Sequence, residues 1–461
     1  MVFSNLIFVG VFLPLVFVLY YICKNTSYRN VILVLTSLVF YAWGEPSLVI
    51  MLAVSITLNY IYGLLIDKFY AGPGAKAAFT AALITNFGFL GVFKYAGFVV
   101  DNLNALLPFE IPEPNISLPL GISFYTFQIL SYIIDLYKGR VKVQKSLIKF
   151  AGYVSMFPQL VAGPIVRYAD IAEELDSRTV TADDFADGSK RFVAGLCKKL
   201  LLANNAGSAA SMLLDNMNMA TGTAWLGILM YTFQIYFDFS SYSDMAIGLG
   251  RMFGFHFIEN FRYPYISRSI TEFWRRWHIS LSTFFRDYVY IPLGGNRYRA
   301  VRNLFIVWFL TGMWHGASWN FILWGLFYGV FLFIEKSSFK QFLMKIPRPF
   351  CYIYTMFFVM VGWALFYYTD TAQLINWFKC AFGKSGAGYD LVTVTTLCSN
   401  AWLIAVCIIG STPLPAWLCR KICSVKGIGI WLEPLMLIAA FVICYSVMVG
   451  STYNPFLYFR F

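Results

Sequence analysis

The apolar run Asn303-LFIVWFLTGMWHGASWNFILWGLFYGVFLF-Ile334 decides the fold class, because it is an uncharged stretch longer than a soluble core requires. About 20 apolar residues are enough for a helix to cross the hydrocarbon of a bilayer. A helix that starts at Asn303 would place His315 about 18 Å along its axis, near the bilayer centre. An ionisable group at that depth usually faces a protein interior or a water-filled cavity. The run predicts a membrane protein in which His315 is either functional or a neutral residue hydrogen-bonded between helices.

The rest of the chain supports a polytopic, all-α membrane protein. Of 461 residues, 59% are hydrophobic and only 13% are charged. Shorter apolar runs at Val31–Trp43, Ile148–Val161, Phe192–Ala210 and Ala401–Ile409 suit buried, re-entrant or tilted helices. We expect about ten to twelve spans in one membrane domain covering residues 1–461. The other long apolar runs are Asn5–Ile22, Leu48–Ile66, Ala78–Phe93, Ile116–Tyr137, Ala224–Ile235, Phe350–Tyr368 and Gly429–Val449.

Charged connections predict the orientation. Two particular connections carry basic residues, and the positive-inside rule places both in the cytoplasm. The connection from Asp101 to Asn115 holds three acidic residues and no Lys or Arg, so we expect it outside. Counting spans from an external N-terminus puts all three connections on these sides. The basic residues are Lys24 and Arg29 in one connection, and Lys138, Arg140, Lys142, Lys145 and Lys149 in the other.

Composition also argues against several functions. The chain has a net charge of +12, and its basic residues lie between apolar spans. This arrangement favours contact with membrane lipids over nucleic-acid binding. Nine cysteines without a CxxC pair predict neither a disulfide framework nor a zinc site. Three histidines without ligand spacing make a metal site unexpected.

A second histidine lies in the segment Ser269-ITEFWRRWHISLSTFFRDYVYIPLGG. Aromatic and leucine residues recur at helical spacing, which predicts an amphipathic helix at the membrane interface. Arg275, Arg276 and Arg286 occupy its other side, where lipid headgroups would satisfy them. His278 lies on the apolar side, so we expect it in the protein interior, where a functional role and a packing role are both open.

The segment Tyr236-FDFSSYSDMAIGLG carries two carboxylates, Asp238 and Asp244. Helix capping, paired carboxylates and structural salt bridges are all open, and the salt bridge is favoured because the downstream arginines offer partners. His256, among aromatic residues, is most simply packed or hydrogen-bonded.

Two motifs together resemble a known family. They are Trp274-RRWHISLSTFFRDYVYIPLGGN and Thr311-GMWHGASWNFILWG. The first contains His278, and the second contains His315, which follows 37 positions later. The combination resembles the membrane-bound O-acyltransferase (MBOAT) superfamily, and its bacterial polysaccharide branch, which includes alginate O-acetyltransferases, is the most similar. Leu118-PLGISFYTFQILSYIIDLY and Phe157-PQLVAGPIVR extend the resemblance over nearly the whole chain.

The resemblance implies a ring of transmembrane helices around a funnel that opens to each face and meets at His315. It implies catalytic roles for His315 and His278, with Arg275 and Arg276 as candidates to bind the phosphates of a thioester donor. That donor would be acetyl-CoA or a phosphopantetheinyl acyl-carrier protein, and no permanently bound cofactor is expected. The implied location is the bacterial plasma membrane. The implied partners are an extracytoplasmic acetyltransferase of the SGNH-hydrolase type and a polysaccharide acceptor.

The ending Thr452-YNPFLYFRF resembles an aromatic ending that, in related systems, is proposed to accept the acyl group on a tyrosine. Tyr458 is the matching position, although Arg460 stands where related endings often have glutamine. The alternative is that the aromatic residues anchor the last helix at the interface. Two other functions stay open: a transporter or flippase, which would also place a histidine at mid-membrane, and a non-catalytic scaffold for polysaccharide export.

Overall fold

In the computed structural model, the described residues are 1–44, 46–114, 116–337, 339–384, 386–425, 429–450 and 456–457. Within these ranges every regular element is a helix, as the sequence predicts. Four helices are long and apolar enough to cross a membrane, or five if the bent pair Leu391–Ser399 and Ala401–Gly410 counts as one span. The all-helical membrane character is therefore confirmed, and the estimate of ten to twelve spans stays a prediction. The four helices are Leu48–Lys68, Pro73–Asn104, Arg348–Tyr367 and Trp431–Gly450.

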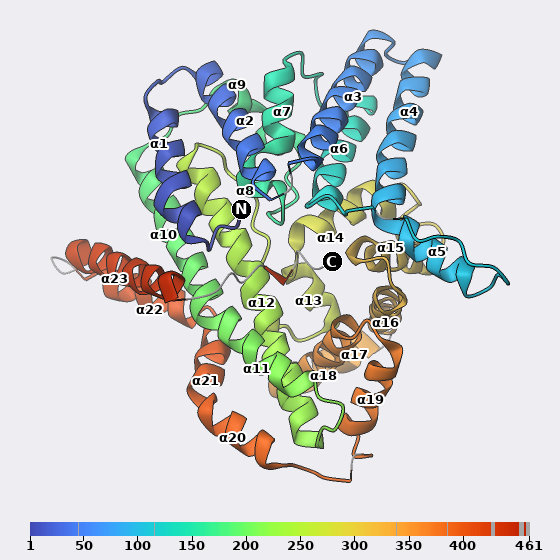
Figure 1. The fold of residues 1–461 in the computed structure, drawn as a ribbon, viewed down its shortest axis with the longest axis vertical. Helices are drawn as coiled ribbons and strands as arrows, with labels where there is room; N and C mark the ends of the chain where they lie inside the picture. The colour runs from blue at the N-terminus through green and yellow to red at the C-terminus, as the bar shows by residue number, and fades with distance from the viewer. Residues whose placement is uncertain are drawn as a thin grey trace. The chain divides into compact units, whose positions relative to one another are not determined.

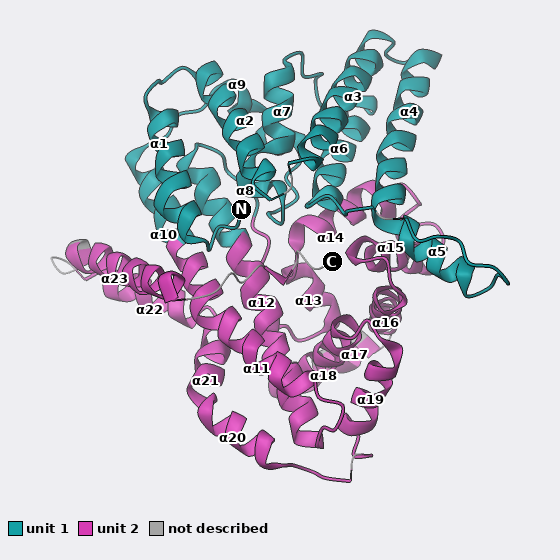
Figure 2. Ribbon diagram, viewed as in Figure 1, with its two compact units in different colours: residues 1–192, 243–258 teal, residues 193–242, 259–461 magenta. Residues whose placement is uncertain are grey.

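Contacts divide the chain into two compact units, residues 1–192 with 243–258 and residues 193–242 with 259–461 (Figure 2). The single membrane domain over residues 1–461 stays a prediction, as does the ring of helices around a funnel. Two long helices, α10 (Ala182–Cys197) and α12 (Thr221–Met252), contribute residues to both units.

The first unit is organised around α6 (Ile122–Tyr137; Figure 1), and almost every residue of this helix is buried. Helices α3, α4, α7 and α9 pack against it, which explains why it is buried on all sides. The acidic connection precedes α6 and the basic connection follows it, so the two lie at opposite ends of one helix. The other elements are η1 (Phe8–Phe12), α1 (Leu13–Tyr21), α2 (Thr26–Ala42), α3 (Leu48–Lys68), α4 (Pro73–Leu90), η2 (Gly91–Tyr95), α5 (Ala96–Asn104), α7 (Leu147–Ser155), α8 (Phe157–Leu160) and α9 (Tyr168–Asp176).

The second unit holds both histidines of the two motifs and a core rich in aromatic side chains. Its core comes mainly from the first part of α12 and from α13, α15, α16, α18 and α19. Its elements besides α12 are η3 (Lys198–Ala203), α11 (Asn204–Leu214), η4 (Pro264–Ile266), α13 (Ile270–Arg276), α14 (Ile279–Phe285), η5 (Arg286–Tyr290), α15 (Ala300–His315), α16 (Trp319–Lys336), α17 (Phe339–Lys345), α18 (Arg348–Tyr367), α19 (Thr371–Ala381), α20 (Leu391–Ser399), α21 (Ala401–Gly410), α22 (Leu414–Cys423) and α23 (Gly429–Gly450).

The apolar run that contains His315 forms a hairpin of two helices, α15 and α16, and not one continuous span. Helix α15 ends at His315, and the chain is extended at Gly316 and Ser318 before α16 begins. A Cβ on Gly312 would collide with the carbonyl oxygen of Phe321, and one on Gly325 with that of Trp308. Small residues at these positions let the two backbones touch, so the run folds back on itself at His315.

The expected amphipathic helix after Ser269 is also interrupted. Helix α13 ends at Arg276, Trp277 is extended, and His278 adopts the left-handed conformation with φ 44° and ψ 56° before α14 begins. The prediction of a single helix was wrong because hydrophobic spacing does not show where the backbone changes direction. The break points His278 into the interior, where the sequence predicts it.

Candidate active site

His315 lies at the tip of the α15–α16 hairpin and is 5% exposed. Its ring packs nearly perpendicular to the rings of Trp324, at a centroid distance of 4.8 Å, and Phe366, at 5.2 Å. The hairpin thus delivers the histidine of one motif to the middle of an aromatic cluster. These apolar surroundings leave little room for bulk water. In such a site an electrostatic interaction is stronger than in solution.

A small cavity opens beside the His315 ring. Its volume is about 20 Å³, which is enough for about one water molecule. One acidic side chain, that of Asp238, contributes to an otherwise apolar and aromatic wall. The complete lining is Ile235, Asp238, Phe239, Trp277, His315, Trp324, Trp363, Phe366 and Leu457, all of which belong to the second unit.

His278 is held by Asn260, a fully buried residue that the sequence analysis did not single out. The Asn260 Oδ1 atom accepts the backbone N–H of Ser280 at 3.2 Å and the Ser280 hydroxyl at 2.9 Å. The same oxygen is 3.1 Å from Nδ1 of His278. Since that oxygen is an acceptor, Nδ1 carries the hydrogen, and Nε2 of the neutral ring keeps its lone pair. No described residue hydrogen-bonds to this Nε2.

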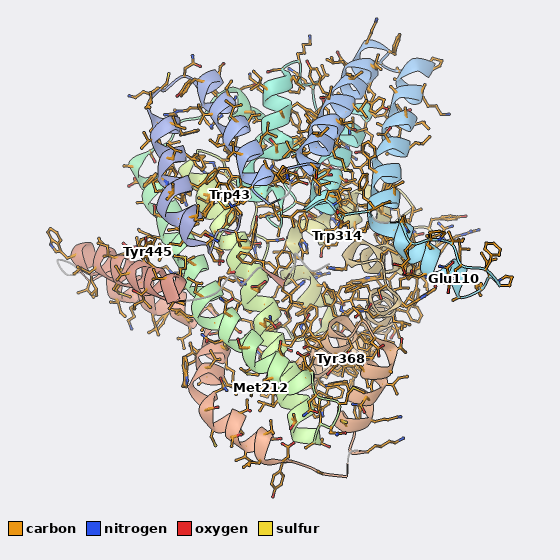
Figure 3. All side chains as sticks on the ribbon, in the orientation of Figure 1. Trp43, Glu110, Met212, Trp314, Tyr368 and Tyr445 are labelled. Atoms are coloured by element: carbon orange, nitrogen blue, oxygen red, sulfur yellow. The ribbon has the colours of Figure 1, made fainter. Side chains whose placement is uncertain are left out.

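The two histidines share one aromatic neighbour. The ring centroid of Trp314, a residue labelled in Figure 3, is 5.7 Å from that of His278 and 4.9 Å from that of His315. Phe239 lies 4.7 Å from His278 and also lines the cavity beside His315. The structure therefore brings the histidines of both motifs into one buried cluster.

A second residue missed by the sequence analysis, Glu335, fixes the start of α13. Its buried carboxylate accepts the backbone N–H groups of Ile270 and Thr271, each at 2.7 Å, and the Thr271 hydroxyl at 2.6 Å. The first N–H groups of a helix have no intrahelical partner, so a carboxylate there stabilises the helix. Its only signal in the sequence is its position as the first charge after the apolar run of α16.

The two candidate donor-binding arginines differ in their surroundings. Arg275 is exposed and makes no ion pair within the described residues. Arg276 pairs with Glu272 at 2.6 Å and donates to the carbonyl of Arg262 at 3.3 Å. Arg275 is therefore the one whose guanidinium is available to an anionic group of a lipid or a donor.

The two carboxylates of α12 form salt bridges, but with residues upstream of α12 and not with the arginines downstream. Asp238 pairs with Lys199 at 2.6 Å, and Asp244 pairs with Arg191 at 2.9 Å. Lys199 has a sequence signal that was missed, because it is a cation inside the apolar run Phe192–Ala210. His256 is largely exposed, and its Nδ1 lies 2.7 Å from a carboxylate oxygen of Glu174.

Tyr458 lies outside the described residues, but the two residues before it are described. Phe456 is buried, and Leu457 lines the cavity beside His315. The chain's C-terminal segment therefore reaches the candidate site, a juxtaposition that no spacing rule in the sequence indicates.

Metal binding finds no support in the described part of the chain, where no three His, Cys, Asp or Glu side chains group closely enough to hold an ion. A buried imidazole with a free lone pair and a second imidazole at a cavity are instead suited to accepting and returning protons.

Helices long and apolar enough to cross a membrane, together with two histidines in one buried cluster, fit the class of membrane-embedded enzymes. The chain belongs to the membrane-bound O-acyltransferase family, which matches residues 136–375, and it is an O-acyltransferase. The matched residues include both histidines of the cluster.

The chain is similar to the probable alginate O-acetylase AlgI of Azotobacter vinelandii, with 46% identity over 79% of this chain and 75% of the relative. It is 46% identical to the protein of the same name from Pseudomonas aeruginosa, over 79% of this chain and 72% of the relative. The peptidoglycan O-acetyltransferase of Helicobacter pylori is 33% identical over 84% of this chain and 80% of its own length.

Proposed function

We propose that the protein moves a short acyl group, acetyl above all, from a cytoplasmic thioester donor across the plasma membrane of a bacterium for O-acetylation of a polysaccharide outside. The observation that carries the proposal is the placement of His315 at the tip of the α15–α16 hairpin, beside a cavity that Leu457 of the C-terminal segment also lines. The relatives named above are acetylases of alginate and peptidoglycan, which supports acetyl as the group and a cell-surface glycan as the final acceptor.

His315 would act as the general base. Its imidazole takes the proton of an acceptor hydroxyl while the hydroxyl oxygen attacks the thioester carbonyl carbon. The C–S bond then breaks, and the departing thiolate takes the proton back from the imidazolium. Such general base catalysis typically contributes about 10² to 10⁴ in rate.

His278 would support this reaction from its position next to Trp314, which contacts both histidines. In the tautomer set by Asn260, the neutral ring offers the lone pair of Nε2. It can therefore accept a hydrogen bond from the acyl donor or from the hydroxyl that receives the acyl group. To stabilise negative charge on the thioester oxygen, the ring must first bind a proton at Nε2.

The donor would be acetyl-CoA or a phosphopantetheinyl acyl-carrier protein, approaching from the basic side of the membrane. Arg275, exposed and without an ion-pair partner among the described residues, is the better placed of the two arginines to bind a donor phosphate. Lipid phosphates compete for the same guanidinium.

Tyr458 would be the first acceptor, because it follows Leu457, which lines the His315 cavity. The acyl group would pass from the tyrosyl ester to an extracytoplasmic acetyltransferase of the SGNH-hydrolase type and then to the polysaccharide. A transporter, a flippase or a scaffold is disfavoured by membership in a family of acyltransferases.

Replacing His315 tests the proposal. His315→Ala should lower transfer of a radiolabelled acetyl group from the donor by about 10² or more, since the base is lost. His256→Ala is the matched control, because His256 is exposed and pairs with Glu174 outside the cluster. Undiminished transfer by H315A at normal membrane levels would refute the catalytic role.

The relay has its own test. Tyr458→Phe should abolish a labelled tyrosyl ester in the C-terminal peptide while donor binding persists, because only the hydroxyl is lost. Mass spectrometry of the C-terminal peptide checks this. An ester found on another residue, or no ester at all in the unmodified chain, would count against the relay alone.

A further inference from the structure

The Lys199–Asp238 pair is buried deeply inside the second unit. The Lys199 Nζ atom is 2.6 Å from Asp238 Oδ1, and the two side chains are 2% and 5% exposed. Bringing two charges out of water costs several kcal/mol per ion, and their mutual attraction often fails to offset this. A well-packed apolar pair would stabilise the fold equally well, so stability alone does not account for this ion pair.

The pair also contacts the C-terminal segment. The second carboxylate oxygen, Asp238 Oδ2, accepts the backbone N–H of Leu457 at 2.7 Å. The Lys199 ammonium lies 4.4 Å from the centre of the Phe456 ring, and that ring packs edge-on against Tyr242 at 5.0 Å. Each charge of the pair therefore holds one residue of the segment, by a charge-assisted hydrogen bond and by a cation–π contact.

The contact is at the reaction cavity. Asp238 and Leu457 both line the cavity beside His315, and Lys199 belongs to η3, a π-helical turn between α10 and α11. Turns of this kind interrupt α-helices frequently at functional sites. The π-helical turn places the Lys199 side chain opposite Asp238. The sequence of the apolar run Phe192–Ala210 does not predict this position.

We propose that Lys199 and Asp238, named here the C-terminal anchor, are positioning residues that hold the C-terminal segment in place, so that Leu457 forms one wall of the His315 cavity. This rests on the proposed function, in which the segment takes part in acyl transfer. The anchor recognises a backbone N–H and an aromatic ring, so it fixes where the segment lies and performs no chemistry itself.

Protection of the C-terminus tests the placement without any catalysis. Purified full-length protein in detergent is digested with carboxypeptidase, and the intact mass shows where trimming stops. With the anchor intact, we expect trimming to stop before Leu457. Asp238→Asn should allow trimming past Phe456, because the loss of the carboxylate charge weakens both the ion pair and the hydrogen bond. Asp244→Asn, which breaks the Arg191 pair on the same helix, should leave protection unchanged.

A second pair of variants separates anchoring from folding. Leu457→Pro removes the backbone N–H that Asp238 accepts while the Lys199–Asp238 pair stays. Leu457→Ala keeps the N–H and removes only the side chain. Because carboxypeptidases stall at proline, this pair is digested with chymotrypsin instead, and cleavage next to the anchor is read by intact mass. We expect faster cleavage in L457P than in the unmodified protein, and unchanged cleavage in L457A.

Transfer of labelled acetyl to the chain is then measured on undigested portions of the same preparations. We expect D238N and L457P to transfer about 10²-fold more slowly, since a small misplacement of a reacting segment is enough for such a loss. Unchanged protection in both variants, or lost protection with unchanged transfer, would overturn the anchor. If H315A transfers normally while the protection pattern is as expected, the proposed function fails and the placement of the segment survives.

Discussion

At the scale of single residues, His278 shows how the chain sustains a strained backbone. A left-handed conformation costs a non-glycine residue about 1–2 kcal/mol. Asn260 offsets this cost, because its backbone carbonyl accepts the N–H of Ile279 at 3.0 Å and its side chain holds both His278 and Ser280. The asparagine and the histidine are therefore expected to act as one unit.

Asn260→Ala tests that unit. The substitution leaves three buried hydrogen-bond donors without their acceptor, so the free energy of unfolding should fall by about 1–3 kcal/mol. Initial rates of acetyl transfer should fall as far as in His278→Ala, and the double variant should be no slower than H278A alone. Asn59→Ala is the matched control, since Asn59 is fully buried and hydrogen-bonded to Asn86 in the first unit. Additive losses for N260A with H278A would contradict the coupling.

The sequence draws attention to residues that are chemically out of place. His315 stands in an apolar run and His278 on the apolar side of a basic segment, and both are buried in one cluster. Asn260 could not be found, because one asparagine in a polar connection carries no signal until its fold partners are known. Catalytic roles for either histidine stay predictions until the variants are measured.

At the scale of elements, the α15–α16 hairpin depends on two glycines, whose lack of a side chain lets the helices meet. Hydrophobicity predicts that residues 303–334 lie in the membrane, but it does not separate one long helix from two antiparallel ones. Gly312 and Gly325 decide this, because only hydrogen atoms fit between the two backbones. The contacts responsible are between residues more than ten positions apart, which periodicity does not encode.

Gly312→Ala should destabilise the protein by about 1–3 kcal/mol through overpacking, seen as a lower midpoint of thermal unfolding in detergent. Gly88→Ala is the matched control within a membrane helix, because a Cβ at Gly88 meets nothing within 4 Å. Alanine favours helix over glycine by up to about 1 kcal/mol, so G88A should be neutral or slightly stabilising. Equal midpoints for the two variants would show that the hairpin contact is not as tight as described.

At the scale of the whole molecule, charge distribution predicts the orientation in the membrane, on which the proposed direction of transfer depends. The connection with Glu110, labelled in Figure 3, precedes α6, and the connection with Lys142 follows it. Sequence alone gives this order and the positive-inside rule gives the sides, but neither gives the number of spans, because several helices are short, bent or broken.

The orientation is tested with Glu110→Cys and Lys142→Cys in a chain whose nine native cysteines are replaced. A membrane-impermeant maleimide should label E110C in intact cells and K142C only after permeabilisation, because the positive-inside rule predicts a cytoplasmic basic connection. The reverse pattern would place the donor side of the proposed reaction on the wrong face.

The small volume of the cavity beside His315 has a consequence for fidelity. A thioester is prone to attack by any nucleophile, and solvent is by far the most abundant. A chamber of about 20 Å³ with a mainly apolar and aromatic wall has room for about one water molecule, which limits hydrolysis of the thioester. Shrinking one of those rings would therefore show first as wasted donor, with free acetate rising before the yield of ester declines.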